Sequence, residues 1–160
     1  MTPRRDRTVA VVGPGQPDDD ALLTIAEDVG AGLAQAGCTV VTGGLGGVMA
    51  AASRGARDAG GLVVGVLPGD DASTANEWVD IAIPTGLGEG RNALVVRAAR
   101  VVVAIGGSWG TLAEIALARR RDTPVIAVQG WRIVGPAPDD GVIDAANAAE
   151  AVRVALALLN

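Results

Sequence analysis

The stretch Val101-Val-Val-Ala-Ile-Gly-Gly-Ser-Trp-Gly-Thr-Leu-Ala-Glu114 joins three kinds of local structure in one short segment. The apolar run Val101 to Ile105 is typical of a strand that is buried on both faces. The glycine-rich segment Gly106 to Gly110 favours a tight turn, and the residues after it have helical character. A strand, a glycine loop and a helix in this order form the repeating unit of an α/β fold.

The same alternation of strand and helix recurs along the chain of 160 residues. Runs rich in Val and Ile predict six strands, at Thr8–Val12, Thr39–Thr42, Leu62–Leu67, Asp80–Ile83, Val101–Ile105 and Val125–Val128. Apolar spacing of three to four residues predicts helices at about Asp19–Gln35, Val48–Ala59, Asn92–Arg100, Thr111–Arg120 and Ala145–Leu159. The intervening segments Pro68–Asn76 and Trp131–Asp140 are predicted loops, with a surface turn at Pro136–Gly141.

This pattern predicts one Rossmann-like α/β domain over residues 1–160. The strands are almost wholly apolar, as expected for a doubly wound, mainly parallel sheet that helices cover on both faces. Gly37 is predicted to end the first helix as its C-terminal cap. Because the crossovers of such a sheet are right-handed, the ligand crevice is expected at the carboxyl ends of the strands.

Three glycine-rich segments each follow a predicted strand and precede a predicted helix. Glycine lets the backbone approach a ligand closely, and the helix amino terminus favours an anion, so a phosphate is the expected guest. Short turns that merely close βα units are the alternative for any one loop. The candidate phosphate-binding residues are Gly13, Gly15, Gly43, Gly44, Gly46, Gly47, Gly106, Gly107, Ser108, Trp109, Gly110 and Thr111.

The spacing of these glycines does not match a dinucleotide fingerprint. In the pattern G-x-G-x-x-G the third glycine is replaced by Asp18 after Gly13 and Gly15, and by Met49 after Gly44 and Gly46. The second predicted strand also ends without an acidic residue that would bind a ribose. We therefore expect a mononucleotide-type ligand rather than NAD.

The composition excludes several chemistries, because the chain contains no His, Lys, Tyr or Phe. Without Lys it can form neither a pyridoxal Schiff base nor a Walker-type phosphate loop. Without His it cannot build a Ser-His-Asp triad or an imidazole-bound zinc site, and no metal or resident cofactor is expected. The remaining groups suit anion binding, or carboxylate chemistry at a carbon that develops positive charge.

Charge and hydropathy limit the partners and the location of the protein. The net charge is −5, and the arginines are scattered along the sequence rather than gathered in one block, so nucleic acid is not an expected partner. No apolar stretch approaches the roughly 20 residues that span a membrane, and the amino terminus lacks the pattern of a secretion signal. A cytoplasmic location is expected. The single cysteine, Cys38, is predicted to be a small buried apolar residue.

Four polar or aromatic residues each have two interpretations. Thr111 and Glu114 have the spacing of a capping box, or they belong to a functional site. Arg91 is a solvated loop residue or a ligand-binding residue at the start of a helix. Trp109 stacks on a base or fills the loop against the core.

The segment Gly106-Gly-Ser-Trp-Gly-Thr-Leu-Ala-Glu114 resembles the P-G-G-x-G-T-x-x-E motif of the LONELY GUY family. The spacing from Arg91 to Thr111 equals that from the family's arginine to its motif threonine. The segment Thr42–Met49 is similar to the family's second glycine-rich loop. The resemblance covers roughly residues 9–128, and it is closest to the branch of small bacterial Rossmann proteins and molybdenum-cofactor carrier proteins.

The resemblance implies a ligand that is a nucleoside monophosphate or a pterin-type phosphate, and a homodimer or larger assembly. In a phosphoribohydrolase, Glu114 would stabilise an oxocarbenium-like ribose or position water, and Arg91 with Asn92 would hold the ligand. A carrier or ligand sensor would use the same loops without chemistry. The chain departs from the phosphoribohydrolase motif, with Gly106 for proline, Ser108 for glycine and Asn92 for lysine.

Overall fold

The computed structural model describes residues 6–135 and 141–160. Its strands are β1 (Thr8–Val12), β2 (Thr39–Thr42), β3 (Leu62–Leu67), β4 (Ile81–Pro84), β5 (Val101–Ile105), β6 (Val125–Val128) and β7 (Val142–Ala145). Its α-helices are α1 (Ala21–Gln35), α2 (Val48–Asp58), α3 (Arg91–Arg97), α4 (Trp109–Arg119) and α5 (Ala148–Leu158). Two short 3-10 helices, η2 (Ala72–Thr74) and η3 (Gly88–Gly90), lie in the loops that flank β4.

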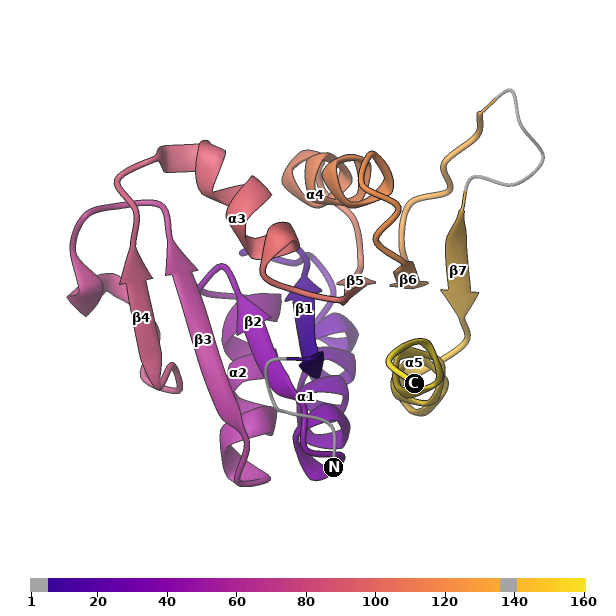
Figure 1. Ribbon diagram of the computed structural model, residues 1–160, viewed down its shortest axis with the longest axis horizontal. Helices are drawn as coiled ribbons and strands as arrows, with labels where there is room; N and C mark the ends of the chain where they lie inside the picture. The colour runs from indigo at the N-terminus through magenta and orange to yellow at the C-terminus, as the bar shows by residue number, and fades with distance from the viewer. Residues whose placement is uncertain (1–5, 136–140) are drawn as a thin grey trace.

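The seven strands form one parallel sheet in the order β4-β3-β2-β1-β5-β6-β7 (Figure 1). The chain first adds strands on one side of β1 and then crosses to β5 on the other side. The sheet therefore has a topological switch point between β1 and β5, which is where α/β folds of this kind bind ligands. The predicted α/β class is confirmed.

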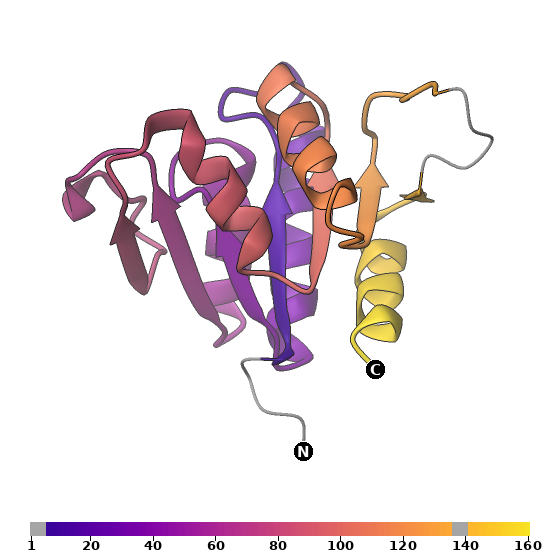
Figure 2. The same cartoon turned by 45° about the horizontal axis from the view of Figure 1, so that its top comes forward.

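Helices cover both faces of the sheet, with α3 and α4 on one face and α1, α2 and α5 on the other (Figures 1 and 2). The core divides accordingly into two clusters of buried residues, one under each helical layer. Because both faces of the central strands are covered, β1, β2 and β5 consist almost wholly of buried residues. This burial explains why their sequences read as continuous apolar runs.

The expected strand count was one too low, because no element was predicted for Val142–Asp144 and Ala145 was predicted as the start of the last helix. Its sequence, Val142-Ile-Asp-Ala145, holds two large apolar residues and lies on the sheet edge, where Ile143 and Asp144 are exposed. An edge strand this short has no continuous apolar run to signal it. The last helix begins instead at Ala148, where the Asn147 side chain accepts a hydrogen bond from the Glu150 N–H at 2.9 Å.

Other local predictions agree closely with the structure. Gly37 ends α1 at a φ of 78°, and the Cys38 N–H donates to the Leu33 carbonyl at 3.0 Å, as a C-terminal cap requires. Cys38 is buried, and burial raises the pKa of its thiol.

The predicted fourth strand is displaced by one residue. The predicted turn at Pro136–Gly141 lies outside the described residues, except for Gly141. Within the described part of the chain, no helix combines the length and the hydropathy that crossing a membrane requires.

Candidate functional site

The three glycine-rich loops lie next to one another at the carboxyl edge of the sheet. They follow β1, β2 and β5, which are adjacent in the order β2-β1-β5. This arrangement brings them together at the switch point, although the second and third loops are about sixty residues apart in sequence. The first two loops are in direct contact, since the Val48 N–H donates to the Pro14 carbonyl at 3.1 Å.

Several candidate glycines serve this close packing. A Cβ atom on Gly13 would lie 2.5 Å from the Ile105 carbonyl oxygen, and one on Gly47 would lie 2.4 Å from the Gly15 carbonyl oxygen. Gly43 and Gly44, the first two glycines of the second loop, are buried. By contrast, Gly15 and Gly46 are exposed and have no close contact at the Cβ position. The exposed pair is therefore free to approach a ligand, whereas the half-buried Gly13 and Gly47 allow the loops to pack closely against their neighbours.

The third loop prepares the amino terminus of α4 for an anion. Gly106 turns the chain at a φ of 67°, and Ser108 becomes the N-cap of the helix. The Ser108 hydroxyl oxygen accepts a hydrogen bond from the Thr111 N–H at 3.1 Å and lies 2.9 Å from the Thr111 hydroxyl oxygen. The amides of Trp109 and Gly110 belong to the first helical turn, where no intrahelical acceptor exists. They therefore face the solvent side of the loop as donors.

The capping-box interpretation of Thr111 and Glu114 is wrong, because Ser108 holds the cap position. Glu114 instead lies one turn along α4 with 7% of its surface exposed. Burial raises the pKa of its carboxyl group to about 7, and the nearby positive charge of Arg91 partly offsets this rise. Glu114 is thus a buried acid that changes charge near neutral pH.

Arg91 is the first residue of α3 and is buried, contrary to the interpretation of a solvated loop arginine. Its Nε donates to the Val66 carbonyl at 3.0 Å, and one of its terminal nitrogens donates to the Gly43 carbonyl at 3.4 Å. The other terminal nitrogen donates to the Asn92 side-chain oxygen. Burial lowers the pKa of Arg91, while Glu114 opposes the shift. Arg91 therefore ties the ends of β2 and β3 to α3.

Arg91 and Glu114 are close enough to influence each other's pKa, but they are not among the ion pairs between described residues. The fold brings them together from α3 and α4, and Arg91 also contacts the second glycine loop at Gly43. Both residues were candidates from the sequence, and the structure places them in one electrostatic environment. Asn92 joins them through its hydrogen bond with Arg91.

A cavity of about 360 Å³ opens beside the third loop. Two tryptophans line it, and their rings meet edge to face with centroids 5.0 Å apart and planes at 83°. Trp109 is 79% exposed, so it does not fill the loop against the core. The full lining consists of Pro14, Gln16, Pro17, Asp18, Asp19, Leu22, Gly107, Ser108, Trp109 and Trp131. Neither Arg91 nor Glu114 belongs to it.

Trp131 and the acidic residues of this cavity were not predicted as site residues. Trp131 contacts the third loop closely, since a Cβ atom on Gly107 would lie 2.2 Å from Trp131 Cδ1. It follows β6, which ends at the same edge of the sheet as β5. A tryptophan just after a predicted strand, in a chain with three tryptophans and no Tyr or Phe, was the available signal. Asp18 and Asp19 precede α1 and offered no comparable signal.

The described residues hold no group of three or more His, Cys, Asp or Glu side chains that could bind a metal ion. The chemical groups of the site are thus the amides and hydroxyls of the third loop, the two indole rings, the carboxylates of Asp18 and Asp19, and the buried pair Arg91 and Glu114. Ser108, the two tryptophans and the two aspartates line the cavity, whereas Thr111 is buried and the pair Arg91 and Glu114 does not belong to the lining.

Comparison with known proteins places the chain among small Rossmann-like proteins. A family model described as the SLOG cluster4 family matches residues 6–156. The molybdenum cofactor binding protein from Rippkaea orientalis is similar in structure, with a TM-score of 0.90, 33% identity, and coverage of 96% of this chain and 97% of that chain. The Moco carrier protein from Chlamydomonas reinhardtii is also similar, with a TM-score of 0.85, 36% identity, and coverage of 95% of this chain and 96% of that chain. An uncharacterized protein of Archaeoglobus fulgidus is 36% identical over 131 residues, which is 78% of this chain and 85% of its own.

Proposed function

The chain belongs to the SLOG cluster4 family, and we propose that it is a carrier that binds a phosphorylated pterin-type cofactor and releases it unchanged. The sequence resembles molybdenum-cofactor carrier proteins. Two structural relatives are named for binding or carrying that cofactor, in agreement with this resemblance. Both relatives match at 33–36% identity over nearly their whole length. This agreement supports the carrier more than the hydrolase.

One observation carries the proposal, namely that the open cavity and the buried pair Arg91 and Glu114 are separate. The cavity combines the amino terminus of α4, which favours a phosphate, with two exposed indole rings that can stack on a flat heterocycle. The guanidinium of Arg91 already donates to two carbonyls and to Asn92. A ligand in the cavity is therefore bound at loops and rings, while the acid that hydrolysis would need lies outside the lining.

A binding experiment tests the carrier. A pterin phosphate, AMP and GMP are titrated separately into the protein by isothermal calorimetry, and free base is then assayed after long incubation. Stacking on an aromatic side chain contributes about 1–3 kcal/mol, so Trp109→Ala should weaken pterin phosphate binding about 10-fold or more. Trp78→Ala is the control, because Trp78 lines a different cavity on α1 and α2. Equal loss in both variants, or release of free base by the wild type, would contradict the carrier.

A phosphoribohydrolase is the second candidate function, and the raised pKa of Glu114 beside Arg91 favours it. In that reaction Glu114 would stabilise the oxocarbenium-like ribose or orient the attacking water, as carboxylates do at glycosidic carbons. Base release from a nucleoside 5′-monophosphate that disappears in Glu114→Gln would establish this function. Tight binding without turnover in the wild type would exclude it.

Self-association into a homodimer or larger assembly forms part of the proposal. Large apolar residues are exposed on β4, in the segment that follows it and on α3, at Ile81 (48%), Ile83 (44%), Leu87 (57%) and Leu94 (39%). A second copy would remove this surface from water. Analytical ultracentrifugation should give an assembly that Ile83→Lys weakens, whereas a wild-type monomer at micromolar concentration would refute this part.

A further inference from the structure

Arginines that are scattered in the sequence gather at the carboxyl ends of α3 and α4. Five of the thirteen arginines lie there although the net charge of the chain is −5, namely Arg97, Arg100, Arg119, Arg120 and Arg121. This end of the helix pair faces away from the glycine loops, because α3 and α4 run back from the carboxyl edge of the sheet toward its amino edge (Figure 2). The protein thus has a local basic surface that its overall charge conceals.

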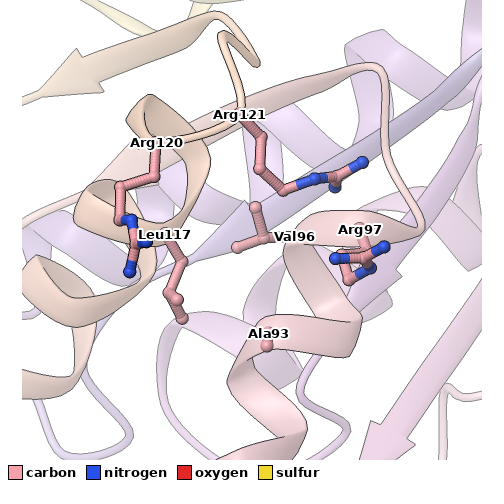
Figure 3. A pocket seen from close by; sticks show the side chains of 6 residues that line it. All are labelled: Ala93, Val96, Arg97, Leu117, Arg120 and Arg121. Carbon is pink, nitrogen blue, oxygen red and sulfur yellow. The ribbon is translucent and has the colours of Figure 1, made fainter.

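Three of these arginines surround a cleft of about 270 Å³ between the two helices. Figure 3 shows Arg120 on one side of the cleft and Arg97 and Arg121 on the other. The apolar side chains of Ala93, Val96 and Leu117 lie between them. The three guanidinium groups come from the last residue of α3, the C-cap of α4 and the residue after it.

None of the three has a carboxylate partner within the described residues. The ion pairs found there join Arg54 to Glu27, Arg57 to Asp80 and Arg153 to Glu150. No hydrogen bond from the side chain of Arg97, Arg120 or Arg121 to another described residue is present either. Three like charges around one cleft repel each other. An anion bound between them would attract all three guanidinium groups and offset that repulsion.

The helix dipoles account for part of this arrangement. A cation in the last turn of a helix is favourable, which explains Arg97 in α3 and Arg119 in α4. Arg120 and Arg121 add two more charges beyond the last turn. Arginine presents a planar fork that binds phosphate oxygens in pairs, so three arginines that line one cleft provide more than dipole compensation.

We propose that this cleft is a second anion site, which takes a small di- or polyphosphate of the inorganic pyrophosphate class between Arg97 on α3 and Arg120 and Arg121 at the end of α4. The site is separate from the glycine loops and goes beyond the proposed carrier function. The cleft is slightly smaller than the roughly 300–1,000 Å³ of sites for larger organic ligands, which favours a compact anion. The number of guanidinium groups favours one that carries several charges.

Isothermal calorimetry with inorganic pyrophosphate at low salt tests the proposal. The variant Arg97→Gln/Arg120→Gln should bind pyrophosphate at the cleft about 10-fold or more weakly than the wild type. The control Arg54→Gln/Arg153→Gln changes the net charge equally at exposed arginines elsewhere and should change affinity less than about twofold. A third variant, Ser108→Ala/Thr111→Val, alters the phosphate loop and should leave cleft binding intact.

Each outcome bears on the proposal. Selective loss in the cleft variant, with binding kept in the loop variant, establishes the second site. Equal loss in the cleft and control variants would reduce the effect to overall charge and overturn it. Loss of all binding in the loop variant would assign pyrophosphate to the glycine loops alone. A short single-stranded oligonucleotide provides the last arm: if it binds the same arginines with a steep salt dependence while pyrophosphate does not bind, the site is a polymer-binding surface and the proposal fails.

Discussion

The two ends of the helix pair α3 and α4 hold the same residue type in opposite environments. At the amino end Arg91 is buried, donates to two carbonyls and Asn92, and lies near Glu114. At the carboxyl end Arg97 is exposed and has no ion pair with a described residue. These two arginines begin and end one seven-residue helix. The environment that packing creates, rather than the residue type, decides whether an arginine organises the fold or remains available to a ligand.

The largest expected effect comes from removing the buried arginine. Arg91→Ala leaves the Val66 and Gly43 carbonyls without their donor and leaves the buried carboxyl group of Glu114 without a nearby positive charge. Loss of one partner of a buried charged network costs about 3–5 kcal/mol. Urea unfolding should therefore show a clearly lower midpoint than in the wild type.

Arg97→Ala is the matched control on the same helix. It removes an exposed arginine, so its free energy of unfolding should change by no more than about 0.5 kcal/mol. If the two variants lost similar stability, the contrast between the two ends of α3 would be wrong.

The next effect is a dependence of stability on pH at the amino end. The pKa of Glu114 is raised from 4.5 to about 7 in the folded protein, so between these values the folded state holds a proton that the unfolded chain has released. Stability should therefore fall as the pH rises from about 4.5 to about 7, by on the order of 3 kcal/mol, and then level off. Denaturant unfolding across this range measures the fall.

Glu114→Gln should remove this pH dependence, because glutamine cannot ionise. Glu89→Gln, an exposed substitution just before α3, should leave the dependence in place. A wild-type protein that became more stable over the same pH interval would contradict the assigned environment of Glu114.

A smaller effect is expected at the cap of α4. Ser108→Ala removes the side-chain acceptor of the Thr111 N–H, and loss of an N-cap costs about 1 kcal/mol. The melting temperature should fall by a few degrees. Arg120→Ala, at the opposite cap of the same helix, should change it less, since Arg120 is exposed there. A larger drop for Arg120→Ala would show that the carboxyl end is the more constrained one.

The smallest effect concerns charge repulsion among the exposed arginines. Arg97→Gln/Arg120→Gln should raise stability by a few tenths of a kcal/mol at low salt, and this gain should disappear above about 0.3 M salt because ions screen the repulsion. Parallel unfolding curves at the two salt concentrations measure the difference. A gain that persisted at high salt would have to arise from packing instead of charge.

Much of this fold was predictable from the sequence because burial on both faces leaves a strong local signal. The central strands β1, β2 and β5 match the predicted runs, since a strand covered by helices on each side must be apolar throughout. The edge strand β7 gave no such signal, because half of its residues are exposed. The positions of the glycine loops followed directly from the strands they end.

Several residues of the candidate site could be predicted from the sequence, whereas their arrangement in space could not. Arg91 and Glu114 were candidates from their positions in the sequence, and the family resemblance gave them roles, but the burial that raises the pKa of Glu114 depends on α3 and α4 packing on one face of the sheet. Trp131 was missed because its contact with Gly107 joins loops that follow two neighbouring strands. Its sequence neighbours carry no sign of that contact.

Local periodicity and composition were therefore enough to predict the α/β alternation and the three glycine loops, and to exclude histidine and lysine chemistry. The tertiary structure alone decided which charges are buried and which are exposed. Strand order places the loops at one edge, and helix packing removes water from Arg91 and Glu114 while leaving Arg97 and Arg120 in solvent. The reason is that desolvation and electrostatic interaction depend on distance in space, which the position of a residue along the chain does not specify.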